Sequence, residues 1–341
     1  MSSQRLENVD HLRAVDAFPH PQINPEDYAK YMKQYYTVVW RNDDAGTKHE
    51  TPLGYMRRDV CHKIIEKVPK EILGEVKVDE SKGTVSLFQD FGTTPEERTP
   101  RVHAVSLYLR DHQVFPILKG WRNELWPVYG DDGKLLYSME RVSLSLLGAM
   151  RFGVHMTGYV KAPDSRHGIK IWVPKRAADK SSFPGMLDNT VAGGLMTGED
   201  PFECIVREAD EEASLPESVV RQGAQSVGTI TYIYITDDRT GEAGYVYPEC
   251  QWVYDLELPA DGSVVPKPKD GEVESFRLCT VDEIREDMAS GRFKPNCAAV
   301  LVDFFIRHGI LTEQNEPHLD EIDRRLHRVI SFPGPHLQAD N

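Results

Sequence analysis

Hydrophobic and polar positions divide the chain into segments of two kinds. Apolar residues that recur every three or four positions predict helices, and short runs rich in β-branched and aromatic residues predict strands. Up to about residue 140 the two kinds are mixed, which predicts a small α+β domain over residues 1–140. The elements expected there are strands at 35–40 and 83–91, helices at 59–67 and 102–109, and a hairpin formed by 126–129 and 135–139.

The pattern becomes more regular after residue 140. Strands outnumber helices in this part, and the helices can cover both faces of a mixed sheet, which predicts an α/β domain over residues 141–315. Residues 316–341 are charged and contain several prolines, so we expect a surface helix or a loosely held tail. The strands are expected at 154–160, 169–173, 189–192, 226–235, 244–258 and 273–278, and the helices near 142–150 and at 201–213, 280–290 and 295–308.

Composition narrows the class of protein. The charge sum is 40 − 54 = −14, and 40% of the residues are hydrophobic, which argues against a disordered chain and against a protein that coats nucleic acid. No apolar run reaches the length of a membrane helix, and the acidic N-terminus is unlike a targeting peptide. The five cysteines are scattered without a Cys-x-x-Cys pair. We therefore expect a cytoplasmic protein with a small-molecule substrate and no nucleic-acid or membrane partner; its oligomeric state stays open.

The segment 193–215 contains the residues with the clearest chemistry. Asp200 is a good N-cap, Pro201 suits the first helical position, and Glu203 can complete a capping box. The helix that follows gathers apolar side chains on one side, whereas three glutamates related by i, i+3 and i+4 gather on another. These are Glu208, Glu211 and Glu212.

Three carboxylates on one helix face repel one another and call for a compensating charge. Arg207 offsets only part of it, and a hard divalent cation with oxygen ligands, Mg²⁺ or Mn²⁺, is the simplest remedy. A solvated acidic helix face is the alternative, and for an arbitrary cluster of this kind it would be the better interpretation. The spacing of the surrounding residues reverses that preference.

The spacing resembles the Nudix box of the Nudix hydrolases. The match holds at Gly193, Glu199, the Arg207–Glu208 pair, Ala209, the Glu211–Glu212 pair and the terminal apolar Leu215. One position departs from the family pattern, because Ser214 stands where the family has a glycine. A glycine there closes the helix in the left-handed conformation, so serine costs about 1 kcal/mol and puts the exit turn in doubt more than metal binding.

The likeness extends beyond the box to one Nudix subfamily, which is related to the Nudix half of fungal thiamine pyrophosphokinase fusions. It is carried by the segments 120–128, 152–159, 172–176, 184–194 and 293–299. This resemblance implies an α/β/α Nudix sandwich preceded by a smaller α+β domain. It also implies hydrolysis of thiamine diphosphate, or of its oxidised oxo- and oxythiamine analogues, to the monophosphate and phosphate. A Nudix pyrophosphatase acting on ADP-ribose or NADH, and a non-catalytic diphosphate-binding module, are the alternatives.

The match to the box also implies roles for its residues. Glu208, Glu211 and Glu212 are assigned as metal ligands, and Arg207 and Glu199 as an ion pair that orients them. All four charged residues Glu199, Arg207, Glu208 and Glu211 are therefore candidate catalytic residues. The general base stays open, since a box glutamate such as Glu211 is one candidate.

Residues outside the box are weaker candidates for the base and for substrate contacts. Glu272 and Glu274 can approach from a neighbouring loop, although a charged turn before a strand explains them equally well. Lys175 and Arg176 at a strand end can meet phosphate oxygens, or be solvated.

Two aromatic residues and one histidine complete the candidates. Trp172 or Trp121 can stack on a cationic ring, but core packing is the better explanation for both. His155 is expected to be a packed or hydrogen-bonded histidine.

Overall fold

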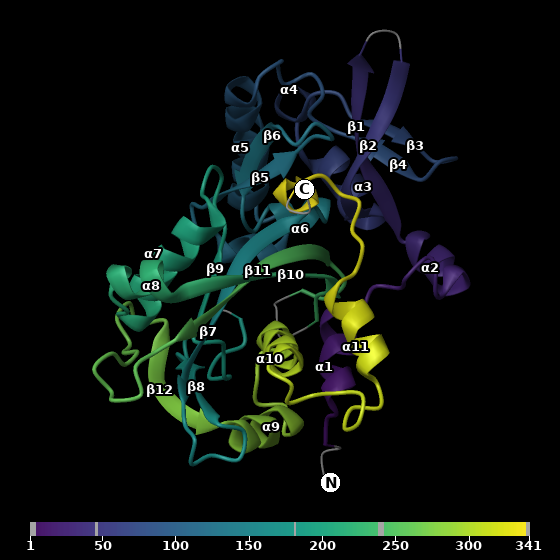
Figure 1. Cartoon of the computed structure of the whole chain (residues 1–341). Coiled ribbons are helices and arrows are strands. Elements are labelled where there is room, and N and C mark those ends of the chain that lie inside the picture. Colours follow the sequence, from purple (N-terminus) through teal and green to yellow (C-terminus); the bar gives the residue numbers. More distant parts are fainter. Residues whose placement is uncertain (1–4, 45–46, 181, 238–241, 339–341) are drawn as a thin grey trace.

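The computed structural model describes residues 5–44, 47–180, 182–237 and 242–338 (Figure 1). Figure 1 shows an N-terminal α+β unit at the top and a layered α/β unit below it. The mixed α/β architecture predicted from the sequence is confirmed. None of the helices in the described part of the chain is long and apolar enough to cross a membrane.

A four-stranded sheet and a hairpin form the N-terminal unit. The sheet has the order β2-β1-β4-β3, in which β1 and β4 are parallel and the other pairs antiparallel. Thr94 caps the long helix α5 with a capping box to Glu97, and the helix begins well before the predicted 102–109. The elements are α2 (Pro25–Met32), β1 (Tyr35–Asp44), β2 (Thr47–Arg57), α3 (Arg58–Lys67), α4 (Lys70–Leu73), β3 (Lys77–Asp79), β4 (Thr84–Ser86), α5 (Pro95–Asp111), η1 (Pro116–Gly120), β5 (Leu125–Tyr129), β6 (Leu135–Glu140) and α6 (Leu144–Leu147).

A mixed six-stranded sheet forms the centre of the second unit. Its order is β10-β11-β7-β8-β12, with β9 paired to the first half of β7, and only the β7–β11 pair is parallel. Small residues at Gly153 and Gly194 let β7 and β9 lie close to neighbouring side chains. The strands are β7 (Arg151–Lys161), β8 (Ile169–Arg176), β9 (Val191–Gly194), β10 (Ala224–Ile235), β11 (Val246–Glu257) and β12 (Val273–Thr280).

Helices cover both faces of this sheet, so the predicted α/β/α sandwich is confirmed. One apolar cluster lies under α7 and α8, and a second lies under α9 and α10, whose inner face is apolar over most of its length. Two separate cores on one sheet are what a three-layer architecture requires. The helices are α7 (Pro201–Ala213), α8 (Glu217–Gly223), α9 (Val281–Ala289) and α10 (Pro295–Arg307).

The two ends of the chain both lie against the second unit. Helix α1 (Asn8–Val15) packs on α10 and on α11 (Leu319–Leu326), and its residues Val9, Leu12 and Val15 belong to the core around α10. After α11 the chain continues to η3 (Pro335–Gln338). The limits at residues 140 and 315 stay a prediction, although helix α1, which lies within the predicted N-terminal domain, packs on the later unit. Residues 339–341 of the expected tail lie outside the described residues.

Several local predictions are wrong. The strand expected at 83–91 is only β4, because residues 88–92 form a bend with Phe88 at a positive φ. The helix expected near 142–150 shrinks to the four residues of α6, which end at left-handed Gly148. Strands β2 and β3 and helices α1, α2, α4 and α8 were not predicted.

Candidate active site

A strand, a loop and a helix place the acidic cluster at one end of the second unit. Strand β9 ends at Gly194, and α7 begins at Pro201 after a short loop. Asp200 caps the helix as predicted, accepting hydrogen bonds from the amides of Phe202 at 2.8 Å and Glu203 at 3.2 Å. The Glu203 side chain does not complete the predicted capping box; it forms an ion pair with Arg221 of α8 instead. This second pairing ties α7 to α8.

The glycine at the start of the box makes room for a glutamate. A Cβ atom built on Gly193 would overlap the Glu208 carboxylate, so any larger residue would push that side chain away from β9. Gly194 has the same need, because its missing Cβ position is filled by the indole of Trp126 from the N-terminal unit. The two glycines therefore permit close contacts with α7 and with β5 respectively.

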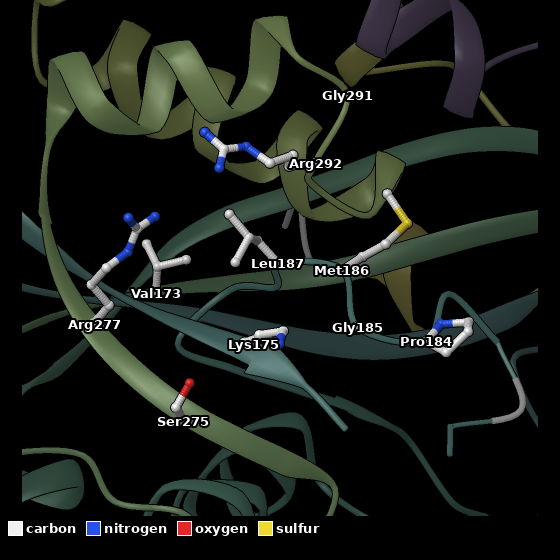
Figure 2. A pocket seen from close by; sticks show the side chains of 10 residues that line it. All are labelled: Val173, Lys175, Pro184, Gly185, Met186, Leu187, Ser275, Arg277, Gly291 and Arg292. Carbon is white, nitrogen blue, oxygen red and sulfur yellow. The ribbon is translucent and has the colours of Figure 1, made fainter. Parts of the chain in front are cut away.

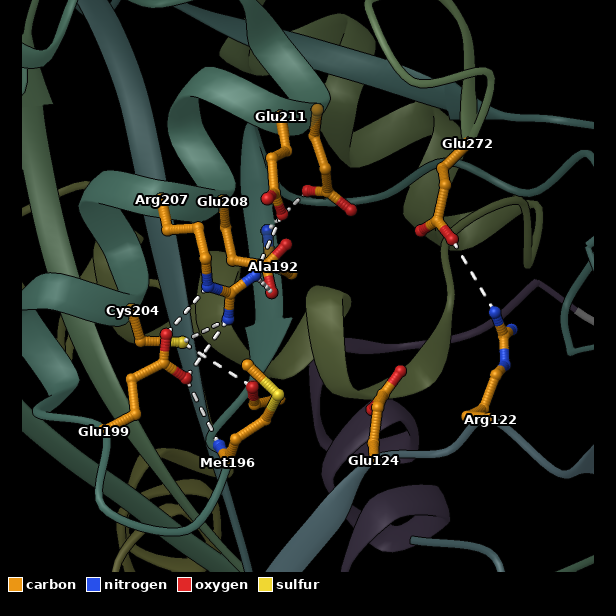
Figure 3. A network of polar contacts seen from close by, with 12 residues as sticks. Arg122, Glu124, Ala192, Met196, Glu199, Cys204, Arg207, Glu208, Glu211 and Glu272 are labelled. Carbon is orange, nitrogen blue, oxygen red and sulfur yellow. Dashed lines mark hydrogen bonds and ion pairs between the residues drawn. The ribbon is translucent and has the colours of Figure 1, made fainter.

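Arg207 is the centre of an ion-pair network in front of the helix (Figure 3). Its Nε and Nη2 donate to the two carboxylate oxygens of Glu199 at 2.7 and 3.1 Å. Its Nη1 donates to Glu208 and to Glu211, at 2.9 Å in each case. The expected Arg207–Glu199 ion pair is thus present, and the same guanidinium also holds two of the three glutamates that we expected to bind metal.

Burial shifts the ionisation of the two inner glutamates. Burial raises the pKa of Glu208 to about 7, and Arg207 only partly opposes this rise. Burial also raises the pKa of Glu212 well above its usual range, and the neighbouring Glu208 and Asp188 add to the effect. A hydrogen bond from the Ala192 amide to Glu212, at 3.1 Å, opposes it. Without a metal ion beside them, both side chains therefore hold a proton more readily than ordinary carboxyls.

The chemistry of these side chains fits a divalent cation. Carboxylate oxygens are the ligands that Mg²⁺ and Mn²⁺ prefer, and a cation would remove the cost of ionising Glu208 and Glu212 in a buried place. Within the described ranges, no three histidine, cysteine or acidic side chains are already gathered as a metal site. Arg207 holds Glu208 and Glu211, while Glu212 faces the Ala192 amide. The metal-ligand roles of Glu208, Glu211 and Glu212 therefore stay a prediction.

Ser214 ends the helix in the conformation that the family glycine would adopt. Its φ of 53° and ψ of 28° are left-handed, and its amide donates to the carbonyl of Asp210 at 3.1 Å. Leu215 then returns to the core, with its amide bonded to the carbonyl of Ala209. The exit turn keeps the helix C-cap geometry, so the serine strains the turn without reshaping it.

The two glutamates of the loop before β12 have different surroundings. Glu272 forms an ion pair with Lys180 and lies 3.8 Å from the guanidinium of Arg122, and its charge contributes to the raised pKa values of Glu208 and Glu212. Glu274 instead forms an exposed ion pair with Lys175 at 2.9 Å. The structure thus brings Glu272 to the box and leaves Glu274 with Lys175.

Lys175 and Arg176 point to opposite sides of β8. Lys175 lines a cavity of about 700 Å³ together with Arg277 and Arg292, on the side of α9 (Figure 2). Arg176 is buried and donates to Asp188 at 2.6 Å and to the carbonyls of Phe183 and Ser182. In this arrangement neither cation is free to meet a phosphate at the box. Lys175 pairs with Glu274, and Arg176 holds the loop before β9.

Trp172 and His155 lie in packed positions, whereas Trp121 is half-buried outside the core clusters of the described residues. Trp172 packs against the core under α7, and Arg110 lies over Trp121 at 4.5 Å. His155 is buried, with Nδ1 2.8 Å from the amide oxygen of Asn189, and burial lowers its pKa to about 4. His155 is thus the packed, hydrogen-bonded histidine that we expected.

Two cations near the box were not found from the sequence. Arg122 reaches Glu272 from the N-terminal unit, and Lys180 reaches it from the loop after β8. No spacing relates either residue to the box, because each arrives through tertiary packing. Arg122 does lie within the segment 120–128 whose likeness to the subfamily was noted, and that was the one available signal.

Comparison with known proteins matches two parts of the chain to described families. Residues 157–297 match the family described as NUDIX domain, and residues 50–151 match a domain of unknown function, DUF4743. The uncharacterised protein YJR142W of Saccharomyces cerevisiae is 33% identical over 335 residues, which cover 96% of this chain and 93% of the yeast protein. The likeness therefore extends through both units.

A plant protein shows a likeness over a shorter stretch of this chain. Nudix hydrolase 20, chloroplastic, of Arabidopsis thaliana is 38% identical over 241 residues, or 70% of this chain. This chain spans only 60% of the length of that plant protein. A crystal structure of DR0079 from Deinococcus radiodurans aligns with 60% of this chain at 18% identity and a TM-score of 0.36.

Proposed function

We propose that this chain, which contains a Nudix domain, is a Nudix hydrolase that hydrolyses the diphosphate of thiamine diphosphate or of its oxidised analogues to the monophosphate and phosphate. The family places it among enzymes that cleave phosphoric anhydrides with the help of divalent metal ions. Mg²⁺ or Mn²⁺ is the cation that we propose, and the cytoplasm the location.

One observation carries the proposal of catalysis: three of the four box glutamates lie around one arginine, and the fourth, Glu212, accepts a hydrogen bond from the Ala192 amide. Arg207 bridges Glu199, Glu208 and Glu211 through four hydrogen bonds. Since a guanidinium has a fixed planar shape, these bonds determine where the carboxylates can point. Such positioning is what hydrolysis of an anhydride between charged groups needs most.

The residues divide the work of the reaction as follows. Glu208, Glu211 and Glu212 would hold the cation, which when bound polarises phosphoryl oxygens and lowers the pKa of water. Arg207 and Glu199 keep these glutamates in place. Glu272 is better placed than Glu274 to accept a proton from the attacking water, because it alone of the two lies within the electrostatic reach of Glu208 and Glu212.

The choice of thiamine compounds has narrower support. It comes from the likeness of segments 152–159, 172–176, 184–194 and 293–299 to the thiamine-pyrophosphokinase-related subfamily. Several of these residues are structural in the described fold: Asp188, Asn189 and Cys297 form a buried hydrogen-bonded group behind β9. This part of the likeness therefore includes residues that support β9 from behind.

A panel of diphosphates tests the proposal. Purified protein is incubated with thiamine diphosphate, oxothiamine diphosphate, oxythiamine diphosphate, ADP-ribose and NADH, with Mg²⁺ or Mn²⁺ and with or without chelator. We expect the highest kcat/KM for a thiamine compound, with release of phosphate and the monophosphate, and no turnover in chelator. Faster turnover of ADP-ribose or NADH would replace the thiamine assignment. Metal-independent binding without hydrolysis of any compound would indicate a binding module.

Variants separate the site from contaminating activity. Glu211→Gln removes one carboxylate of the box, whereas Asp210→Asn removes a neighbouring exposed carboxylate that pairs with Lys269. We expect the first variant to lose turnover and the second to keep it. Equal activities of the two variants would show that the hydrolysis arises elsewhere.

A further inference from the structure

The N-terminal unit contacts the loop of the Nudix box directly. The amide of Thr197 donates to the carbonyl of Leu125 at 2.9 Å, and the Thr197 hydroxyl donates to Ser138 at 2.9 Å. Trp126 fills the space above Gly194. Strands β5 and β6 are therefore docked on the chain segment that leads from β9 to α7, and the loop before β5 is held beside the box.

That loop, residues 121–124, has a defined conformation. The amide of Arg122 donates to Glu140, which is fully buried, at 2.9 Å. Asn123 has a φ of 61° and accepts a hydrogen bond from the indole of Trp121 at 2.9 Å. Glu124 forms an ion pair with Arg141 at 3.0 Å. These contacts fix the backbone on both sides of Arg122, so its side chain leaves the loop in a set direction.

The side chain of Arg122 points toward Glu272 beside the box glutamates (Figure 3). The guanidinium is 3.8 Å from the Glu272 carboxylate, a distance too long for a hydrogen bond, and 39% of the side chain is exposed. Glu272 already has a close ion-pair partner in Lys180. Arg122 is thus a half-exposed cation with N–H groups to spare, and an exposed ion pair of this length contributes little stability.

We propose that Arg122 binds the diphosphate of the substrate, so that the N-terminal unit completes the active site of the Nudix unit. This inference rests on the proposed function. The substrate is anionic and the site is rich in carboxylates, so a cation with spare N–H groups at this place favours anion binding. The planar guanidinium can donate two parallel hydrogen bonds to phosphoryl oxygens. The same contact assigns a role to the domain of unknown function: it presents Arg122 and supports the box loop.

Steady-state kinetics of Arg122→Ala and Arg122→Lys test this role, with the diphosphate that the wild-type enzyme hydrolyses fastest. Loss of a charge-assisted hydrogen-bonding group predicts a rise in KM of about 10- to 100-fold for the alanine variant. The lysine variant keeps the charge and loses the planar fork, so we expect a smaller rise. The inhibition constant of inorganic phosphate should rise in parallel with KM. Arg41→Ala serves as the control, because Arg41 lies in the N-terminal unit and pairs with Glu50.

The outcomes separate this inference from the proposed function. Arg122→Ala kinetics within twofold of those of Arg41→Ala, with an active wild type, would overturn the role of Arg122 alone. A fall in kcat with unchanged KM and unchanged phosphate inhibition would also overturn it, since that result would indicate an effect through Glu272. A wild-type protein that hydrolyses no diphosphate in the panel would overturn both. Melting temperatures of the variants show whether each is folded.

Discussion

The protonation state of the box carboxyls has to change when a cation binds. Glu208 and Glu212 are buried carboxyls whose pKa values are raised, to about 7 for Glu208, so near neutral pH the metal-free protein keeps more protons on them than ordinary carboxyls would hold. Metal ligation requires the ionised form, and binding should therefore release protons. Arg207, which holds Glu208 and Glu211, has to share these carboxylates with the ion.

Glu212→Gln should abolish turnover without lowering the stability of the metal-free protein. The folded pKa of Glu212 is raised, so its ionised form costs stability as pH rises above the unfolded value of about 4.3. The amide is neutral at every pH and removes that cost. We expect the rate of phosphate release to fall by more than about 100-fold. This loss exceeds the one that usually follows removal of a residue hydrogen-bonded to a metal ligand. The melting temperature in chelator at pH 8 should equal or exceed that of the wild type; a clear fall would contradict the buried, protonated state.

Asp188→Asn should destabilise the fold through a neighbouring buried ion pair. Burial alone would raise the pKa of Asp188, but Lys294 and Arg176 more than offset it and hold the pKa well below its usual range. Removing one partner of a buried pair costs about 3–5 kcal/mol. Because the folded pKa is depressed, this contribution is fully present above the unfolded pKa of about 3.9 and is lost as pH falls below it.

Urea denaturation at pH 7 and at stepwise lower pH measures this contribution. The free energy of unfolding of Asp188→Asn should be lower than that of wild type at pH 7, and the difference should shrink below about pH 4. Asp210→Asn, which removes an exposed partner of Lys269, should change stability by less than about 1 kcal/mol. A difference between wild type and Asp188→Asn that is constant with pH would contradict the ionised state of Asp188.

At the scale of elements, the acidic helix was the part best predicted. Its cap, its first proline and its apolar stripe all act within a few residues, so the sequence alone gives the bounds of α7. The partner of Glu203 was predicted wrongly, because Arg221 lies on another helix. Strand β2 was missed for a similar reason: it is stabilised by pairing along β1 over its whole length, and its own residues are largely polar. Local signals predict local structure, whereas pairing partners come from the whole fold.

The exit turn of α7 offers a test with a matched control. Ser214 has a φ of 53°, whereas Ser290 at the end of α9 has a φ of −86°. Glycine removes strain at the first position and only adds backbone freedom at the second. Ser214→Gly should therefore stabilise the protein by about 1 kcal/mol, and Ser290→Gly should leave it unchanged or slightly less stable. Chemical denaturation measures the change in the free energy of unfolding for each substitution. Equal changes for the two substitutions would contradict a left-handed Ser214.

At the scale of the whole molecule, the two units contact each other at the loop of the box. The sequence predicted both units but not their contact, since the docking of Trp126 over Gly194 joins residues 68 positions apart and has no local signature. The terminal helices α1 and α11 also return to the later unit, on the side of α10. This docking places Arg122 of the N-terminal unit beside Glu272 of the Nudix unit. The Nudix unit alone would therefore lack the phosphate-binding arginine that we propose.

Gly194→Ala should weaken the docking of the units. The added methyl group would overlap the indole of Trp126, and accommodating it should cost about 1–3 kcal/mol. Gly120→Ala is the control, because a Cβ at Gly120 would lie 3.6 Å from Val142, an ordinary contact. The free energy of unfolding should be lower for Gly194→Ala than for Gly120→Ala. A Gly194→Ala protein as stable and as active as Gly120→Ala would show that the close contact is unimportant.

Diffraction from crystals soaked in Mn²⁺ tests the central claim most directly, because anomalous scattering locates the ion independently of activity. We predict an anomalous peak within coordination distance of carboxylate oxygens of Glu208, Glu211 and Glu212, and no such peak in Glu212→Gln crystals soaked in the same way. A peak that lies elsewhere, with the three side chains turned away from any ion, would contradict the assignment of the acidic helix face as the metal site of a diphosphate hydrolase.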